Sequence, residues 1–366
     1  SDAAGNASVQ ATHSLSVDTT APALAITSGA LVNSTTPVVS GTAEANASVT
    51  VSVGGATYTT TASSGGVWSI DTNLGTTGQQ TKSGTLSLNA NGSNAVSVVA
   101  TDAAGNTASA SQSLVIDTTA PSIAISTTAL DNVINTTEHG SAVTISGTTS
   151  GVENGRTVTV TLNSVNYTAT VSGNAWSLSV PQAAVAGLSD GTYTVTASVS
   201  DAAGNAAVQA SQLVRVDTSA PALTIGAIAI DDVLNALEHG SGLVISGTTT
   251  AENGQVVTVS LNGQTYTGIA NGGVWSVAVG ASDVSALTQA HGAYTVTANV
   301  SDAAGNASVQ ATHSLSVDTT APALAITSGA LVNSTTPVVS GTAEANASVT
   351  VSVGGATYTT TASSGG

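Results

Sequence analysis

Acidic side chains recur through this sequence and are its candidates for binding a ligand. The chain has 366 residues, with 20 Asp and Glu against 3 Lys and Arg, and a formal net charge of −17. All but three of the acids (Asp71, Asp190 and Asp283) stand at recurring positions of similar sequence. Because unneutralised carboxylates that lie close together repel one another, such a pattern favours a cationic partner, of which a metal ion is the simplest.

Four positions account for the recurring acids. The first is the Asp that opens "DTTAP" or "DTSAP", namely Asp18, Asp117, Asp217 and Asp318. The second is a Glu in a turn such as "GTAEANA", namely Glu44, Glu153, Glu252 and Glu344. The third is the Asp of "DAAGN", namely Asp2, Asp102, Asp201 and Asp302, with Asn106, Asn205 and Asn306 closing three of these motifs. The fourth lies in "LDNVINTTEHG" and "IDDVLNALEHG", namely Asp131, Glu138, Asp231, Asp232 and Glu238.

The spacing of these motifs reveals a tandem repeat of about 100 residues. Residues 1–66 are identical to residues 301–366, and "DTTAP" or "DTSAP" opens each shorter unit. We therefore predict the tail of one unit, three whole units and the head of another: 1–17, 18–116, 117–216, 217–317 and 318–366. The partial units lack the equivalent of residues 67–100, so we expect them to be frayed.

The elements that must position the acids are short β-strands. Residues 48–53, 157–162 and 256–261 alternate apolar and polar side chains and are rich in β-branched residues. Turn residues separate these runs, no stretch of convincing amphipathic helix appears, and "PQAAVAGL" at 181–188 could form one helical turn at most. About seven short strands per 100 residues predict an all-β tandem array of immunoglobulin-like sandwiches forming an extended rod.

In this fold the chain start, the loop after the second strand and the loop before the last strand share one end. The first three positions should therefore converge, with Asp117, Glu153 and Asp201 meeting the side-chain oxygen of Asn205. The fourth position lies at the opposite end, where Asp131 and Glu138 should face the first three positions of the next unit. Mixed carboxylate, amide and carbonyl oxygens suit Ca²⁺ better than Mg²⁺, which demands tight octahedral geometry. The sequence thus predicts structural calcium sites.

Two simpler interpretations stay open at this point. "DAAGN" is also a tight-turn sequence, in which Asp caps its own backbone and Gly takes a positive φ. "DTTAP" is also a linker sequence, in which Pro stiffens an extended chain. The linker interpretation is compatible with a metal role.

The aromatic and histidine residues predict packing rather than binding. Trp68, Trp176 and Trp275 alternate within strand patterns, which favours the core over a sugar-stacking surface. Tyr193 and Tyr294 begin the penultimate strand, where sandwiches place a corner-bridging tyrosine. Asn94 stands there in the first whole unit. The five His residues have no Cys or second His at metal-ligand spacing and are expected at the surface.

Several functions are disfavoured by composition and motifs. The acidic balance argues against nucleic acid and against an anionic membrane surface. No apolar run approaches the ~20 residues that span a bilayer. There is no Cys, and no nucleophile elbow, P-loop or "HExxH" appears, so we expect no enzyme.

The motifs "DTTAP", "SGTAEANASVTV", "DAAGN" and "LDNVINTTEHGSAVTISGTT" resemble tandem bacterial immunoglobulin-like domains of giant repetitive adhesins. The resemblance covers essentially the whole chain. It implies an extracellular stalk at the bacterial cell surface, exported by type I secretion and serving adhesion and biofilm formation. It also implies that calcium at the junctions between neighbouring repeats stiffens the array. The host or surface receptor is not identified by the sequence.

One unit departs from this pattern, since "SGALVNSTTP" at 28–37 lacks the acids of the fourth position. Its junction is expected to bind fewer ions and to bend more. The alternative functions are a glycan- or protein-binding module and an accessory region of an extracellular carbohydrate-active enzyme. The first alternative calls for an aromatic or hypervariable loop in a single unit, and the sequence contains none.

Overall fold

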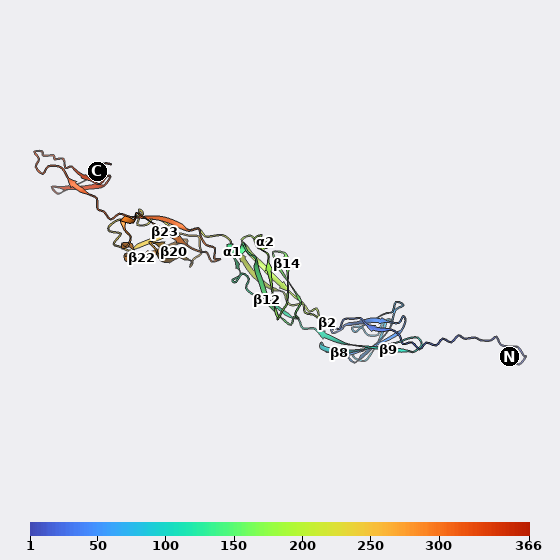
Figure 1. The fold of residues 1–366 in the computed structure, drawn as a ribbon. Coiled ribbons are helices and arrows are strands. Elements are labelled where there is room, and N and C mark those ends of the chain that lie inside the picture. Colours follow the sequence, from blue (N-terminus) through green and yellow to red (C-terminus); the bar gives the residue numbers. More distant parts are fainter. The chain divides into compact units, whose positions relative to one another are not determined.

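The computed structural model describes residues 1–366, and it is almost entirely β (Figure 1). The chain divides into two compact units, residues 1–134 with 138–216 and residues 135–137 with 217–366. The first unit holds two β-sandwiches, and the second holds a third sandwich and the last strands of the chain. The all-β class predicted from the alternating strands is confirmed.

The first sandwich consists of β1 (Leu24–Ile26), β2 (Leu31–Val32), β3 (Val38–Ala43), β4 (Ser48–Val53), β5 (Ala56–Thr61), β6 (Val67–Asp71), β7 (Gln80–Ser83), β8 (Asn91–Thr101) and β9 (Thr107–Asp117). One sheet has the order β1-β3-β6, and the other has the order β2-β9-β8-β4-β5-β7. Strand β2 pairs with β9 in parallel, whereas the other pairs are antiparallel. The edge strand β7 has no counterpart in the other sandwiches.

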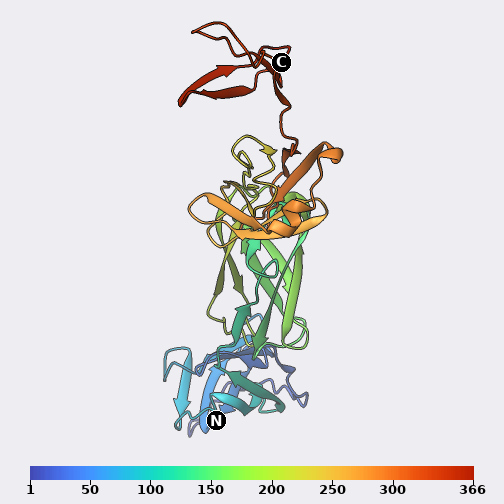
Figure 2. The ribbon, with the colours of Figure 1, turned by 90° about the vertical axis from the view of Figure 1, so that its left-hand side faces the viewer.

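The second sandwich consists of β10 (Ser122–Ile125), β11 (Val133–Ile134), β12 (Val143–Ser150), β13 (Thr157–Leu162), β14 (Val165–Thr170), β15 (Ala175–Val180), α2 (Gln182–Val185), β16 (Gly191–Ser198) and β17 (Ala210–Val216). The short helix α1 (Thr136–His139) follows β11. The sheets have the orders β10-β12-β15 and β11-β17-β16-β13-β14. Their strands are green in Figures 1 and 2. The single helical turn expected within 181–188 is present as α2.

The third sandwich consists of β18 (Val233–Leu234), β19 (Leu243–Thr248), β20 (Val256–Leu261), β21 (Gln264–Ile269), β22 (Val274–Val279), α3 (Ala281–Ser285), η1 (Gln289–His291), β23 (Ala293–Asn299) and β24 (Ala311–Val317). The sheets have the orders β19-β22 and β18-β24-β23-β20-β21. The chain continues through β25 (Leu324–Ile326), β26 (Gly341–Ala343), β27 (Ser348–Val353) and β28 (Ala356–Thr361). These strands form two separate pairs, β25-β26 and β27-β28, and residues 1–17 form no strand.

The strand predictions are confirmed most closely where alternation is strongest. Strands β4, β13 and β20 begin and end at the residues that the alternation indicates. In β13 every second side chain is buried, beginning with Val158. The first two sandwiches, with nine and eight strands, have more than the predicted seven or so. In the second sandwich the consecutive strands β10 and β11 join opposite sheets.

A tryptophan fills the centre of each sandwich. Trp68, Trp176 and Trp275 are at most 2% exposed, so the core prediction for these residues is confirmed. Each ring lies over the glycine that is paired with it on the neighbouring strand of the same sheet. A Cβ atom on Gly147, for example, would stand 2.5 Å from the Trp176 ring and 2.0 Å from the carbonyl oxygen of Ala124. The "SGT" glycine is therefore required because a side chain there has no room.

Candidate functional site

The "DAAGN" motif folds as a turn around its own aspartate. In the second sandwich, Asp201 Oδ1 accepts the N–H groups of Gly204 and Asn205, each at 2.8 Å. Asp201 Oδ2 accepts Asn205 Nδ2 at 2.8 Å, and Gly204 takes φ +96°. Even the exposed first hexapeptide makes the corresponding bonds from Asn6 to Asp2. The turn interpretation is therefore correct for the motif itself, because it forms without the rest of a sandwich.

These hydrogen bonds keep the turn aspartates ionised. Burial alone raises the pKa of Asp201, which is 1% exposed, but the hydrogen bonds from Asn205 and Gly204 outweigh it. The pKa of Asp201 consequently lies below the ordinary value. At Asp102 the side-chain hydrogen bond from Asn106 is the largest influence, and the pKa is likewise lowered. Both carboxylates are therefore negatively charged at neutral pH.

The first three acidic positions come together at one end of the second sandwich. Glu153 Oε2 accepts the N–H of Ala202 at 2.7 Å, next to Asp201. Asn205 Nδ2 donates to the main-chain carbonyl of Asp117 at 2.8 Å. The third sandwich repeats this arrangement, with Glu252 on the N–H of Ala303 and Asn306 on the carbonyl of Asp217: the distances are both 2.9 Å. Three segments distant in sequence are thus tied together by these bonds.

The carboxylate that opens each repeat has a local task. Asp117 Oδ1 accepts the N–H of Thr119 at 2.9 Å, and Asp18 does the same with Thr20. The main-chain carbonyl of the opening Asp, rather than its carboxylate, accepts the hydrogen bond from the "DAAGN" asparagine. No group of three or more His, Asp and Glu side chains within residues 1–366 is placed to hold a metal ion. The carboxylate and carbonyl groups gathered here nevertheless offer only oxygen atoms, the ligand type that Ca²⁺ prefers.

The acids of the fourth position also have local partners. Asp131 Oδ1 accepts the N–H of Val133 at 2.9 Å. Glu238 Oε2 accepts the N–H of Asn235 at 3.1 Å, while Asn235 Oδ1 accepts the N–H of Glu238 at 3.1 Å. This reciprocal pair has the bonding pattern of a capping box, here closing a turn. The metal role assigned to these acids remains a prediction.

Asp232 differs from its counterpart in the second sandwich, the neutral Asn132. Its Oδ1 accepts the N–H of Ile228 and lies 2.7 Å from His313 Nε2. The bond from Ile228, followed by that from His313, lowers the pKa of Asp232. Asn132 Oδ1 accepts the N–H of Thr128 in the same way. The contact between Asp232 and His313 is therefore an addition specific to the third sandwich.

Three of the five histidines have side-chain hydrogen-bond partners that sequence reasoning missed. The Nε2 atoms of His139 and His239 lie 2.9 and 2.7 Å from the carbonyl oxygens of Leu188 and Leu287. These bonds fasten the "EHG" loop to the segment after α2 or α3. The third is His313, paired with Asp232. "EHG" and the helical segment occur together in two repeats and are both missing from the first. That co-occurrence was the available signal.

An arginine lies close to the acidic end of the second sandwich. Arg156 Nε donates to the carbonyl oxygen of Ser200 at 3.0 Å, and Ser200 directly precedes Asp201. The corresponding residues of the other two sandwiches are Ala47 and Gln255. Nothing local in the sequence indicates that residue 156 reaches residue 200.

The corner position is filled in all three sandwiches. Tyr193 Oη accepts the N–H of Ser189 and donates to its carbonyl oxygen, both at 3.0 Å. Tyr294 makes the same pair of contacts with Thr288. The corner-tyrosine prediction is confirmed. Asn94 replaces the phenol in the first sandwich, with Oδ1 accepting the N–H of Asn89 at 2.7 Å and Nδ2 donating to its carbonyl at 3.0 Å.

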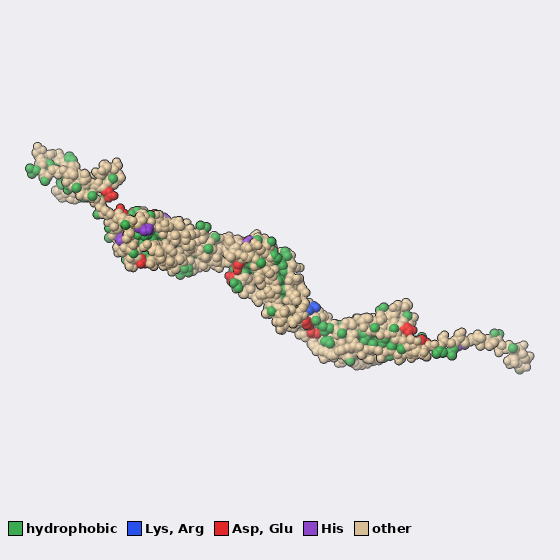
Figure 3. Space-filling model, viewed as in Figure 1, with side chains coloured by type: hydrophobic (Ala, Val, Ile, Leu, Met, Phe, Trp, Pro, Cys, Tyr) green, Lys and Arg blue, Asp and Glu red, His purple; other side chains and the backbone are tan.

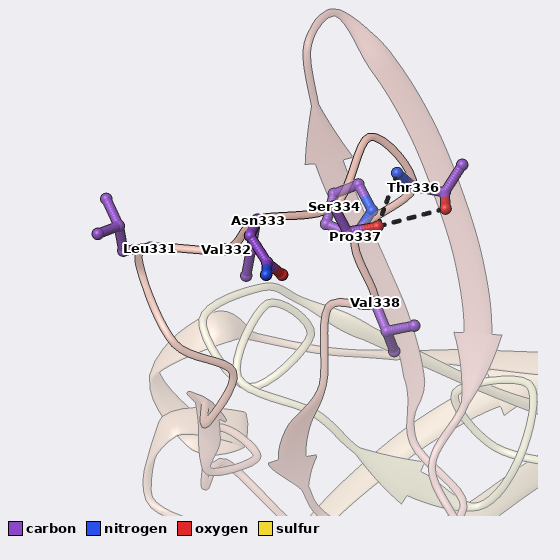
Figure 4. A pocket seen from close by; sticks show the side chains of 7 residues that line it. All are labelled: Leu331, Val332, Asn333, Ser334, Thr336, Pro337 and Val338. Atoms are coloured by element: carbon purple, nitrogen blue, oxygen red, sulfur yellow. Dashed lines mark hydrogen bonds between the residues drawn. The ribbon is translucent and has the colours of Figure 1, made fainter.

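The surface offers little else that could bind a ligand. Figure 3 shows a face on which charged side chains are sparse. A hollow at residues 331–338 is bounded by a loop in which Ser334 Oγ accepts the N–H of Thr336 at 3.1 Å (Figure 4). The identical segment 31–38 of the first sandwich carries β2, which pairs with β9. None of the helices is long and apolar enough to cross a bilayer.

Comparison with known proteins begins with two family models. The model of the bacterial Ig-like domain matches residues 25–118 and 125–218. The model of the bacterial Ig-like domain, group 3, matches residues 182–269 and 282–366. No curated protein matches the chain.

Solved structures of adhesins also resemble the chain. A structure from a Ca²⁺-stabilized adhesin that helps an Antarctic bacterium reach out and bind ice is 34% identical, covering 95% of this chain and 90% of that one, with a TM-score of 0.40. A 1.5-MDa bacterial ice-binding adhesin is 31% identical, covering 78% and 91%, with a TM-score of 0.40. A tetra-tandem repeat in the extending region of a large adhesion protein is 27% identical, covering 90% and 85%, with a TM-score of 0.29.

Proposed function

The chain belongs to the bacterial Ig-like domain family, and we propose that it is a structural extender segment of a bacterial cell-surface adhesin. The repeats would be residues 18–116, 117–216 and 217–317, flanked by parts of two more. Their task would be mechanical, because a rod of such repeats holds a terminal binding domain away from the cell. The observation that carries this proposal is that the recurring motifs have structural tasks: the "SGT" glycine packs against the buried Trp, and the "DAAGN" turn ties segments together at one end of the sandwich.

The second part of the proposal is that Ca²⁺ binds at the acidic ends of the sandwiches and stiffens the array. The support is that Glu153, Asp201 and the opening Asp117 belong to segments tied together by hydrogen bonds. The adhesin that is 34% identical is itself described as Ca²⁺-stabilized. Glu153 is exposed and uses one oxygen for Ala202, so its other oxygen is open to a cation. Bound cations would relieve the repulsion among these carboxylates.

Calcium would act by linkage, because an ion that binds only the folded sandwich stabilises it. Sites with dissociation constants of about 10⁻⁴–10⁻³ M are filled outside cells and empty in the cytosol. An unstable, calcium-free chain would suit type I secretion, and the absence of Cys would leave no disulfide to block passage. A role in biofilm formation and in holding a receptor-binding domain belongs to this proposal as well.

The test is thermal unfolding of the full chain with calcium or with a chelator. At a calcium concentration 100-fold above the dissociation constant, the stabilisation is about 2.7 kcal/mol per site. For a sandwich of this size that raises Tm by about 10–20 °C. An unchanged Tm after chelation would refute the calcium role.

The ligand assignment is tested by Glu153→Gln. The amide oxygen can still accept the N–H of Ala202, so the variant removes mainly the charge. The calcium-induced rise in Tm should shrink for the second sandwich alone. Asp71→Asn removes an acid outside the recurring positions and serves as the matched control. A full calcium response in the Glu153 variant would show that this residue is not a ligand.

A further inference from the structure

The side-chain oxygen of Asn306 has a partner outside its own turn. Asn306 is 4% exposed, and its Nδ2 donates to Asp302 Oδ2 and to the carbonyl oxygen of Asp217, each at 2.9 Å. Its Oδ1 accepts two hydrogen bonds from Thr136, one from the N–H at 2.8 Å and one from Oγ1 at 2.7 Å. Both ends of the buried amide are therefore used, and half of its bonding goes to the segment 135–137.

That segment belongs to the second compact unit, although it follows β11 in the chain. Thr136 Oγ1 also lies 2.9 Å from the carbonyl oxygen of Thr218, so its single proton is shared between two acceptors. Asn135 Oδ1 accepts the N–H of Thr137 at 2.9 Å, which holds the segment in a tight turn. These contacts seat residues 135–137 on the start of the following repeat.

The asparagine that begins the docked segment lies within van der Waals range of the "DAAGN" glycine. A Cβ atom on Gly305 would stand 3.4 Å from Asn135 Nδ2. In the first unit, a Cβ atom on Gly204 would stand 3.5 Å from Asn33 Nδ2. Asn33 begins "NST" as Asn135 begins "NTT". The same approach therefore recurs, although the first of these loops lacks the acidic residues that characterise the second.

We propose that the Gly-Asn pair of "DAAGN" is a docking site for an Asn-Thr or Asn-Ser segment of the preceding repeat. The ligand is a piece of the same repeated chain, recognised by its main-chain N–H and its hydroxyl. An amide suits the site because it donates to Asp302 and Asp217 while accepting from Thr136, which a carboxylate cannot do. This inference goes beyond the calcium proposal, since the bonds require no metal ion.

The proposal also predicts which repeats dock less tightly. The segment 235–236 reads Asn-Ala and lacks the hydroxyl, whereas 333–334 reads Asn-Ser and keeps it. A repeat that follows Asn-Ala loses one of the two bonds to its asparagine. Sequence variation at this single position would thus tune the attachment of the next repeat.

The test is amide hydrogen exchange of the full chain, measured at residue 136 in calcium and in chelator. Asn306→Ala should accelerate exchange there about tenfold or more, because the N–H of Thr136 loses its hydrogen-bond acceptor, the side-chain oxygen of Asn306. Asn106→Ala breaks the corresponding bonds to Asp102 and to the carbonyl of Asp18, and serves as the matched control. It should leave residue 136 unchanged.

Hydrogen-exchange protection of β23 reports whether Asn306→Ala still folds. If it does not fold, a second pair of variants at Thr136 tests the proposal. Thr136→Ser should keep the wild-type rate, and Thr136→Ala should raise it severalfold. Unchanged exchange at residue 136 in folded Asn306→Ala would overturn the proposal. So would equal rates in the Ser and Ala variants, or protection that disappears on chelation. Protection that persists in chelator, together with no effect of calcium on Tm, would leave this docking intact and refute the calcium proposal alone.

Discussion

The first and second sandwiches share a framework but fasten it with different side chains. Each has a buried Trp over a glycine, and each has a "DAAGN" turn bonded to the carbonyl that opens the repeat. In the second sandwich, Tyr193 bridges the corner and His139 fastens the helical segment. In the first, Asn94 bridges the corner. The comparison teaches that packing at the centre is fixed, whereas the fastenings at the edges are interchangeable.

The first sandwich replaces the helical fastening with a strap. The Nε2 atom of Gln80 lies 2.9 Å from the carbonyl of Asp71 and 3.3 Å from those of Leu74 and Gly75, and its Oε1 accepts the N–H of Asp71. Gln80 itself is 6% exposed. One buried amide thus organises the connection that α2 and "EHG" organise in the second sandwich. The second sandwich uses the "EHG" loop and the short helix α2 at this connection, whereas the first sandwich uses strand β7 and Gln80.

The largest effect is expected at the shared centre. Trp68→Ala and Trp176→Ala should each cost about 3–5 kcal/mol of unfolding free energy, because each leaves a cavity in a core of small side chains. Each loss should be confined to the sandwich that carries the variant, as monitored by hydrogen exchange of the strands. An equal loss in the unmutated sandwich would contradict the view that each packs its own core.

An intermediate effect is expected at the turn. In Asp201→Asn one oxygen becomes an NH₂ group that faces the donor of Asn205, so the variant should cost about 1–3 kcal/mol. Since the pKa of Asp201 is lowered in the folded chain, its contribution is present above about pH 4 and is lost as pH falls through the folded pKa. In the variant, the free energy of unfolding of the second sandwich should therefore depend less strongly on pH in the acid range. An acid-unfolding midpoint identical to that of the wild type would contradict this role.

The smallest effect is expected at the interchangeable corner. Tyr193→Phe and Asn94→Ala remove the same pair of contacts in the two sandwiches, and each should cost about 1 kcal/mol. Chemical unfolding measured with a separate probe in each sandwich would report both values. A loss above about 3 kcal/mol at only one of the corners would show that the phenol and the amide are not equivalent.

Much of this architecture could be read from the sequence because its causes are local. Alternation fixed the bounds of β4, β13 and β20, and the turn chemistry of "DAAGN" depends on bonds within five residues. The contacts of His139 and Thr136 could not be read in this way. Each joins residues whose meeting depends on which loop lies beside which end of a sandwich. Such a contact can be inferred from the sequence only when its two partners are present together or missing together in the repeats, as "EHG" and the helical segment are.

We propose above that this chain is a spacer stiffened by calcium. Small-angle X-ray scattering of the full chain, recorded in calcium, in chelator and after calcium is restored, tests it most directly. In calcium the chain should have a large average dimension with a narrow spread. In chelator the average dimension should be smaller and the spread broader, and restoring calcium should recover the first curve. Superimposable curves in all three conditions, with the sandwiches still folded, would contradict it.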